Sequence, residues 1–179
     1  MTKAETTKIH ILQAANRVIQ RDGVSKLTLE AVATEAKVSK GGLLYHFPNK
    51  NALITGMIDY FLGNFEGILD SSKTENPREW LRGYVRSTFD MTNSQLADSR
   101  ALIAAVANQP ELLNRVREKY ADWQARAEAS GIDPALATVI RLAADGLWFT
   151  ELLGISTISD ALYPAVERAI LALIDSHGG

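Results

Sequence analysis

The sequence has no cysteine and no long apolar run. Without a thiol, a disulfide framework, a cysteine-ligated metal site and a cysteine nucleophile are all excluded. No window approaches a run of about 18 apolar residues, and the first ten residues hold no apolar stretch of the kind that a secretion signal needs. We therefore expect a cytoplasmic protein with no membrane partner. Because only 5 of 179 residues are proline and 46% are hydrophobic, a disordered or collagen-like chain is also excluded.

The chain has little net charge, only -2, which by itself argues against a nucleic-acid partner. The charge is unevenly spread, however. Residues 1–50 hold eight Lys or Arg against four acids, which gives +4, whereas the remainder carries 11 basic and 17 acidic residues, which gives -6. A chance fluctuation remains one explanation, and a basic contact module on an acidic body is the other.

Apolar residues recur every three or four positions along nearly the whole chain, with no strand alternation and no internal repeat. The pattern predicts an all-α fold of about nine helices, packed in two unequal parts. Thr28, Ser39 and Asn49 are of the residue types that cap helices, and Gly23 and Pro48 are of the types that end them. A polar loop is expected over 70–77. The predicted helices span 5–22, 29–36, a segment between Ser39 and Pro48, a longer one after Asn49, and 78–92, 95–108, 110–129, 134–154 and 159–176.

Residues 28–47 place two short helices around the turn at 37–39, behind a longer amphipathic helix. This layout is typical of a helix-turn-helix, in which the second helix enters the major groove of DNA. Gly41 and Gly42 in the first turn of that second helix each cost about 1 kcal/mol of helix stability relative to alanine. Either these positions fray and the cost is small, or the missing side chains let the backbone approach base edges closely. Lys40 and Lys50 flank the helix and can neutralise phosphates.

The two stretches LTLEAVA at 27–33 and VSKGGLLYHFPNK at 38–50 resemble the DNA-binding signature of the tetracycline-repressor (TetR) family of bacterial transcription regulators. The resemblance covers about 50 residues. It implies a DNA-binding domain at 1–50 and an all-helical ligand-binding and dimerisation domain at 51–179. It also implies a repressor that binds a palindromic operator in double-stranded DNA and is released by an unidentified small-molecule effector.

Carried over by position, the resemblance implies that Thr28 caps the first short helix and reaches a phosphate. The resemblance also implies that residues 40–42 contact the base edges and that residues 44–46 and Lys50 contact the DNA backbone. The chain departs from the family at Lys37, where glycine is frequent, at Gly42, where a small hydroxyl residue is common, and at Leu44, where tyrosine is usual. The predicted DNA-binding residues are Thr28, Ser39, Lys40, Gly41, Gly42, Leu44, Tyr45, His46 and Lys50.

Large aromatic residues on the later helices either line an effector cavity or are simply core. The candidates for ligand contact are Phe61, Phe65, Trp80, Tyr84, Phe89, Trp123 and Trp148. Polar anchors for the ligand could come from charged residues on the same helices, although surface or ion-pair roles are the better interpretation for most of them. These residues are Arg82, Arg86, Arg100, Arg141, Asp90 and Asp145. In the last two helices, small residues among aliphatic ones predict a homodimer through a four-helix interface, although the same stripe also fits packing within one chain.

An enzyme is the main rival class. The three histidines, His10, His46 and His177, are scattered, and no metalloprotease, nucleophile-elbow or phosphate-loop motif is present. We therefore predict no catalytic residues, no metal site and no cofactor. A helical ligand carrier is the remaining alternative, and the basic N-terminal segment with Lys40 and Lys50 argues against it.

Overall fold

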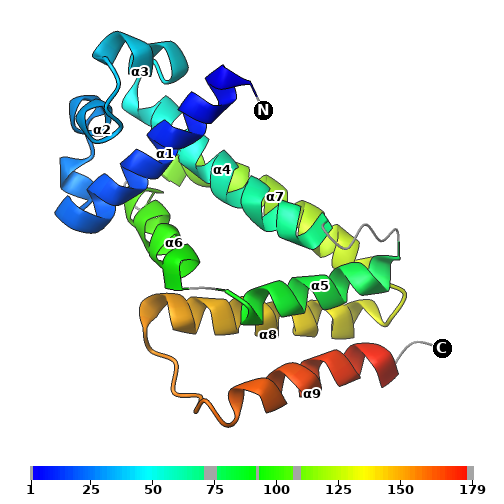
Figure 1. The fold of residues 1–179 in the computed structure, drawn as a ribbon. Helices are drawn as coiled ribbons and strands as arrows, with labels where there is room; N and C mark the ends of the chain where they lie inside the picture. The colour runs from blue at the N-terminus through cyan, green and yellow to red at the C-terminus, as the bar shows by residue number, and fades with distance from the viewer. Residues whose placement is uncertain (1, 71–75, 92, 107–109, 177–179) are drawn as a thin grey trace. The chain divides into compact units, whose positions relative to one another are not determined.

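The computed structural model describes residues 2–70, 76–91, 93–106 and 110–176 (Figure 1). These residues form nine α-helices and two short 3-10 helices with no strand among them, so the predicted all-α fold is confirmed. Most of the predicted loop at 70–77 lies outside the described residues. In chain order the elements are α1 (Lys3–Asp22), η1 (Val24–Lys26), α2 (Leu29–Glu35), α3 (Lys40–His46), α4 (Lys50–Asp70), α5 (Pro77–Phe89), α6 (Asn93–Val106), η2 (Pro110–Leu112), α7 (Leu113–Glu128), α8 (Pro134–Leu153) and α9 (Tyr163–Ser176).

The helix ends follow local side-chain chemistry. The predicted cap at Asn49 is confirmed, because its side-chain oxygen accepts a hydrogen bond of 2.8 Å from the amide of Ala52. At the start of α1, Thr2 and Glu5 form a capping box, which begins this helix two residues earlier than its apolar pattern indicates. Pro110 opens a 3-10 turn before α7 rather than the α-helix itself.

The chain divides into two compact units. One comprises Met1–Gly63 and Ala97–Val116, and the other comprises Asn64–Leu96 and Arg117–Gly179. The predicted domain boundary at residue 50 coincides with the first residue of α4, a helix that continues without a break from one unit into the other. The division at this residue stays a prediction.

The first unit has a core built on α1. α1 buries its apolar face and packs against α2 and η1, and α3 packs against α2. The first half of α4 and α6 contribute further buried residues. Since α2 and α3 have only seven residues each, they are too short to be stable alone, and this packing holds them in place. The core residues include Ile11, Leu12, Ala15, Val18, Leu27, Val32, Leu43, Phe47, Leu53, Ile54, Met57, Ile58, Ala101 and Leu102.

Gly56 on α4 lets the ring of Phe47 approach the helix backbone. A Cβ at this position would lie 2.6 Å from Cε1 of Phe47 and 3.3 Å from Cδ2 of Leu12. Phe47 follows the last residue of α3 and is 2% exposed. Its packing against α4 therefore holds the end of α3 in place.

We expect Gly56→Ala to lower the free energy of unfolding by about 1–3 kcal/mol, because the added methyl group overpacks the contact with Phe47. Gly63→Ala is the matched control on the same helix, since a Cβ there meets nothing within 4 Å. That control should raise stability by up to about 1 kcal/mol through helix propensity. Urea unfolding of both variants tests this, and equal shifts of the same sign would show that Gly56 has no packing role.

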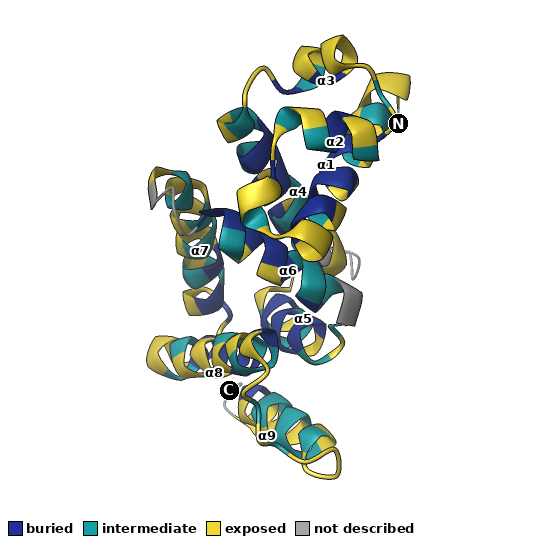
Figure 2. Ribbon diagram, turned by 90° about the vertical axis from the view of Figure 1, so that its left-hand side faces the viewer, coloured by how far each residue is buried: buried dark blue, intermediate teal, exposed yellow. Residues whose placement is uncertain are grey.

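In the second unit, α5 packs against α8 and α9. Its buried residues come mostly from α5, α7 and α8, while α9 contributes Ile174 (Figure 2). None of the helices in the described part of the chain is both long enough and apolar enough to cross a membrane.

Candidate nucleic-acid interface

The turn between α2 and α3 is fixed by caps on both sides. Thr28 Oγ1 accepts a hydrogen bond of 3.1 Å from the amide of Ala31, and Ser39 Oγ accepts one of 3.0 Å from the amide of Gly42. Both sequence-predicted caps are therefore confirmed. Between the helices, Lys37 has a positive φ of 53°, the left-handed conformation that glycine adopts most easily. Lys37 therefore replaces the glycine that is frequent in the family at a position where the backbone is left-handed.

α3 presents one face to the core and the other to solvent. Leu43 and the following Phe47 are buried, whereas the segment 39–42 is exposed and Tyr45 is 82% exposed. Leu44 is 37% exposed, and His46 and Lys50 are half-buried. The predicted DNA-binding residues of α3 therefore lie mainly on its solvent face, which leaves a short helix free to enter a groove.

The two glycines of α3 differ in how far the fold requires them. A Cβ at Gly41 would meet nothing within 4 Å, and a Cβ at Gly42 would meet only the Ser39 hydroxyl at 3.2 Å. Neither residue has a positive φ. Packing and backbone conformation thus give no reason for glycine at position 41, and the first turn of α3 presents bare backbone to solvent.

Ion pairs within the first unit neutralise part of its positive charge. Arg17 and Arg21 from α1 bind the Glu35 carboxylate of α2 at 2.8 and 2.7 Å, and their hydrogen bonds lower the pKa of Glu35. Arg21 also pairs with Asp22 at 2.8 Å. These contacts brace α1 against α2, so both arginines serve the fold.

Lys40 makes a further ion pair, with Glu30 of α2, at 2.6 Å between Nζ and Oε1. The hydrogen bond from Lys40 lowers the pKa of Glu30. Since three basic and three acidic residues of the first 50 are engaged in this way, the net +4 belongs to lysines outside these pairs. Those lysines are Lys3, Lys8, Lys26, Lys37 and Lys50, set against the single acid Glu5.

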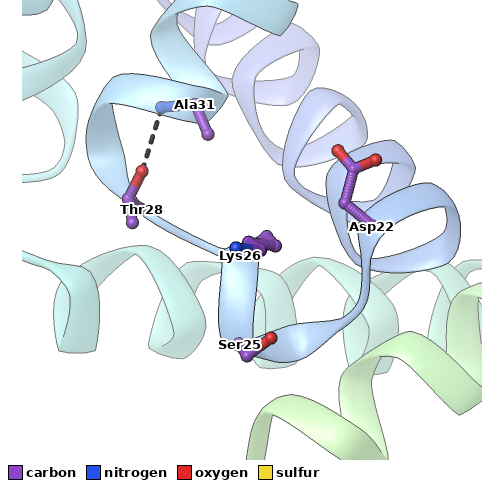
Figure 3. A pocket seen from close by; sticks show the side chains of 5 residues that line it. All are labelled: Asp22, Ser25, Lys26, Thr28 and Ala31. Atoms are coloured by element: carbon purple, nitrogen blue, oxygen red, sulfur yellow. Dashed lines mark hydrogen bonds between the residues drawn. The ribbon is translucent and has the colours of Figure 1, made fainter.

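A depression of about 650 Å³ lies beside the start of α2, lined by Asp22, Ser25, Lys26, Thr28 and Ala31 (Figure 3). Thr28 points its hydroxyl at the amide of Ala31, which is the capping bond described above. Lys26 brings a positive charge to the same rim. The predicted phosphate contact of Thr28 would be made here, next to a cation.

The candidate effector residues are only partly brought together. Phe65, Trp80, Tyr84 and Trp123 form a ring cluster, with centroid distances of 5.1 Å for Phe65–Trp123 and 5.5 Å for Phe65–Tyr84 and Trp80–Tyr84. Phe89 instead contacts Tyr163. The other two candidates lie apart from the cluster's contacts: Phe61 belongs to the first unit, and Trp148 is half-buried on α8.

A buried polar network adjoins this aromatic cluster. Tyr84 donates a hydrogen bond of 2.6 Å to Asp145, which also binds Arg141 at 2.5 Å. Arg141 donates to Gln124 at 2.7 Å, and Gln124 donates to Thr138 at 2.7 Å. Burial raises the pKa of Asp145, against the opposing effects of Tyr84 and Arg141. Of the roles considered for Arg141 and Asp145, the structure therefore shows an ion pair.

Two of the candidate tryptophans leave a donor unused. The indole N–H groups of Trp80 and Trp148 are buried and find no acceptor in the described part of the chain. Since a buried donor without an acceptor costs free energy, these groups are suited to a ligand that carries acceptor oxygens or nitrogens. Across the described residues, no three His, Cys, Asp or Glu side chains gather as a metal site would require.

α8 and α9 both carry exposed residues, drawn in yellow in Figure 2, and several of these are apolar. On α8 the exposed positions follow a spacing of three and four: Val139, Leu142, Gly146, Phe149 and Leu153. On α9 they include Ala169, Ala172 and Leu173, and Leu162 is exposed just before the helix begins. Exposed apolar stripes of this kind on two helices of one unit are typical of an interaction surface.

Family models match both parts of the chain. Residues 11–57 match the model described as bacterial regulatory proteins of the tetR family, and residues 78–175, more than half of the chain, match a tetracycline-repressor-like C-terminal domain. The chain belongs to the TetR family. The resemblance predicted from the signature at 27–50 is thereby confirmed.

Individual relatives of this TetR-family chain are distant. The regulator TtgR of Pseudomonas putida is 26% identical over 98 residues, which are 55% of this chain and 47% of TtgR. UidR of Escherichia coli is 33% identical over 57 residues, which are 32% of this chain and 29% of UidR. The chain therefore spans about half the length of TtgR and less of UidR.

Solved structures agree with the fold along nearly the whole TetR-family chain. A transcriptional regulator from Rhodococcus sp. Rha1 has a TM-score of 0.69 at 20% identity, with 98% of this chain and 96% of that chain covered. NalD, the secondary repressor of the MexAB-OprM multidrug efflux pump in Pseudomonas aeruginosa, has a TM-score of 0.70 at 17% identity, with 99% and 98% covered. At these identities the likeness shows a shared fold.

Proposed function

We propose that the protein is a transcriptional repressor of the bacterial cytoplasm that binds a palindromic DNA operator as a homodimer and is released by a small-molecule effector. The observation that carries DNA binding is the solvent face of α3, where an exposed lysine and two exposed glycines lie in one helical turn and a Cβ at Gly41 would meet no neighbour. With Leu43 and Phe47 anchoring the other face, this turn is held rigidly and is open to a major groove.

Dimerisation through α8 and α9 is part of the proposal. The apolar stripes of the two helices provide a four-helix contact between two copies, which buries surface that one chain leaves in water. Two linked α3 helices then read half-sites about one helical turn apart.

The effector site is proposed at the ring cluster of α4, α5 and α7 and the adjoining polar network that includes Arg141 and Asp145 of α8. An effector that binds better to the DNA-incompetent conformation must weaken DNA binding by the same factor as DNA weakens effector binding. The unused indole donor of Trp80 in this cluster favours an aromatic or apolar effector with acceptor atoms.

The DNA-binding proposal predicts different roles for Lys50 and Lys40. Lys50→Ala should weaken binding to all sequences by a similar factor and reduce the slope of log affinity against log salt, because a phosphate contact is lost. Lys40→Ala should also relax the preference for one base. Titration of the duplex upstream of the protein's own gene, at several salt concentrations, measures both effects.

Two results of that titration would contradict the proposal. If wild-type protein shows no site tighter than bulk DNA, or no loss of binding as salt rises, the protein is not a regulator of this kind. Identical behaviour of Lys50→Ala and Lys40→Ala would reject the division of roles between phosphate and base.

A further inference from the structure

Glu30 lies where an acid is unexpected on a DNA-binding surface. It is the second residue of α2 and it binds Lys40, the first residue of α3, at 2.6 Å. Both side chains stay well exposed, at 63% for Glu30 and 61% for Lys40, so burial does not force them together. A positive charge at a helix N-terminus is unfavourable, and Glu30 compensates for it.

The pair leaves Lys40 with unused hydrogen-bonding capacity. An ammonium group has three N–H donors, and the contact with Glu30 Oε1 requires one of them. The neighbouring Gly41 contributes no side chain, and the space around its Cβ position is empty. Two donors of Lys40 are therefore available to a ligand that approaches the first turn of α3.

The charge of Glu30 decides which acceptor fits. A phosphate bound by Lys40 would lie within a few ångströms of the Glu30 carboxylate, and the two anions would repel each other. The O6 and N7 atoms of guanine are neutral acceptors placed side by side in the major groove, and a lysine can contact both. Guanine can accept hydrogen bonds from the two free N–H groups of Lys40 while the ion pair with Glu30 persists.

We propose that Glu30 is a specificity-determining residue, which holds Lys40 so that it reads guanine in each half-site and is withheld from phosphate. This inference rests on the proposed DNA-binding function. Lys40 alone, as a flexible point charge, would bind phosphate and base edges with little distinction. When it is paired with Glu30, Lys40 prefers guanine to phosphate.

The test is a selection from a library of randomised DNA duplexes with the full chain and with Glu30→Gln. Wild-type protein should enrich one guanine at a fixed position of each half-site. Glu30→Gln should lose about tenfold or more of the preference for that guanine. Its binding to non-specific duplex should tighten, with a salt slope steeper by about one for each added phosphate contact. Glu111→Gln removes the same charge from η2, outside the helix-turn-helix, and should change neither quantity.

Each outcome of the selection decides a different point. Undiminished guanine preference and an unchanged salt slope in Glu30→Gln overturn this inference and leave the proposed function intact. Failure of the wild-type protein to enrich any sequence overturns the proposed function itself. A second comparison, in a Lys40→Met background, separates direct from indirect action. There, adding Glu30→Gln should change base preference no further, and a further change would show that Glu30 contacts the base itself.

Discussion

Replacing Leu142 and Phe149 together by glutamate is expected to turn the proposed dimer into a monomer and to weaken operator binding by about 100-fold or more. The two side chains lie on the exposed stripe of α8, where they are 54% and 51% exposed in the single chain. Glutamate at either position is well solvated in the monomer, but a four-helix contact would bury its charge without a partner. When the dimer is lost, each α3 binds its half-site separately, and the gain from linking two contacts disappears.

Sedimentation of the double variant and its titration onto operator DNA measure the two effects. Ala121→Glu, at an exposed position of α7, adds a charge to the same unit outside the α8 and α9 stripes. It should remain dimeric and bind normally. The thermal unfolding of the isolated double variant checks that the monomer is folded. A folded double variant that stays dimeric would place the interface on another surface of the chain.

Much of this fold could be predicted from sequence because its signals are local. Helical periodicity and helix caps act over one or two turns of chain, and the caps Thr28, Ser39 and Asn49 occur in the structure where they were expected. The early start of α1 was missed, since Thr2 and Glu5 stabilise a first turn that carries no apolar repeat.

The site was less predictable because its details depend on contacts between helices. The spacing of Glu30 and Lys40 does not reveal their ion pair, which arises only once the turn at Lys37 brings α2 and α3 together. Gly56 likewise resembled any glycine within a helical pattern, until the structure placed the ring of Phe47 against it. The same limit applied to Tyr84, whose bond to Asp145 joins two helices that are distant in sequence.

Gly41→Ala should strengthen the fold and weaken DNA binding at the same time. Since a Cβ at Gly41 meets nothing within 4 Å, the substitution gains helix propensity without a clash and should raise the free energy of unfolding by up to about 1 kcal/mol. On the operator, the same methyl group stands between the first turn of α3 and the base edges. Because each half-site loses close approach, affinity should fall by about tenfold or more, or roughly 1.4 kcal/mol per tenfold.

A rise in stability together with a fall in DNA affinity would show that Gly41 serves DNA binding, and that it is not present merely because the first turn of α3 frays. If first-turn fraying explains Gly41, alanine there should leave DNA affinity unchanged whatever it does to stability. Gly63→Ala controls for stabilisation alone, because it lies on an open face of α4 outside the helix-turn-helix. Urea unfolding and operator titration of both variants complete the comparison. Equal DNA affinity in Gly41→Ala, Gly63→Ala and wild-type protein would remove the strongest reason for placing the first turn of α3 against bases, because the fold itself makes no use of glycine at position 41.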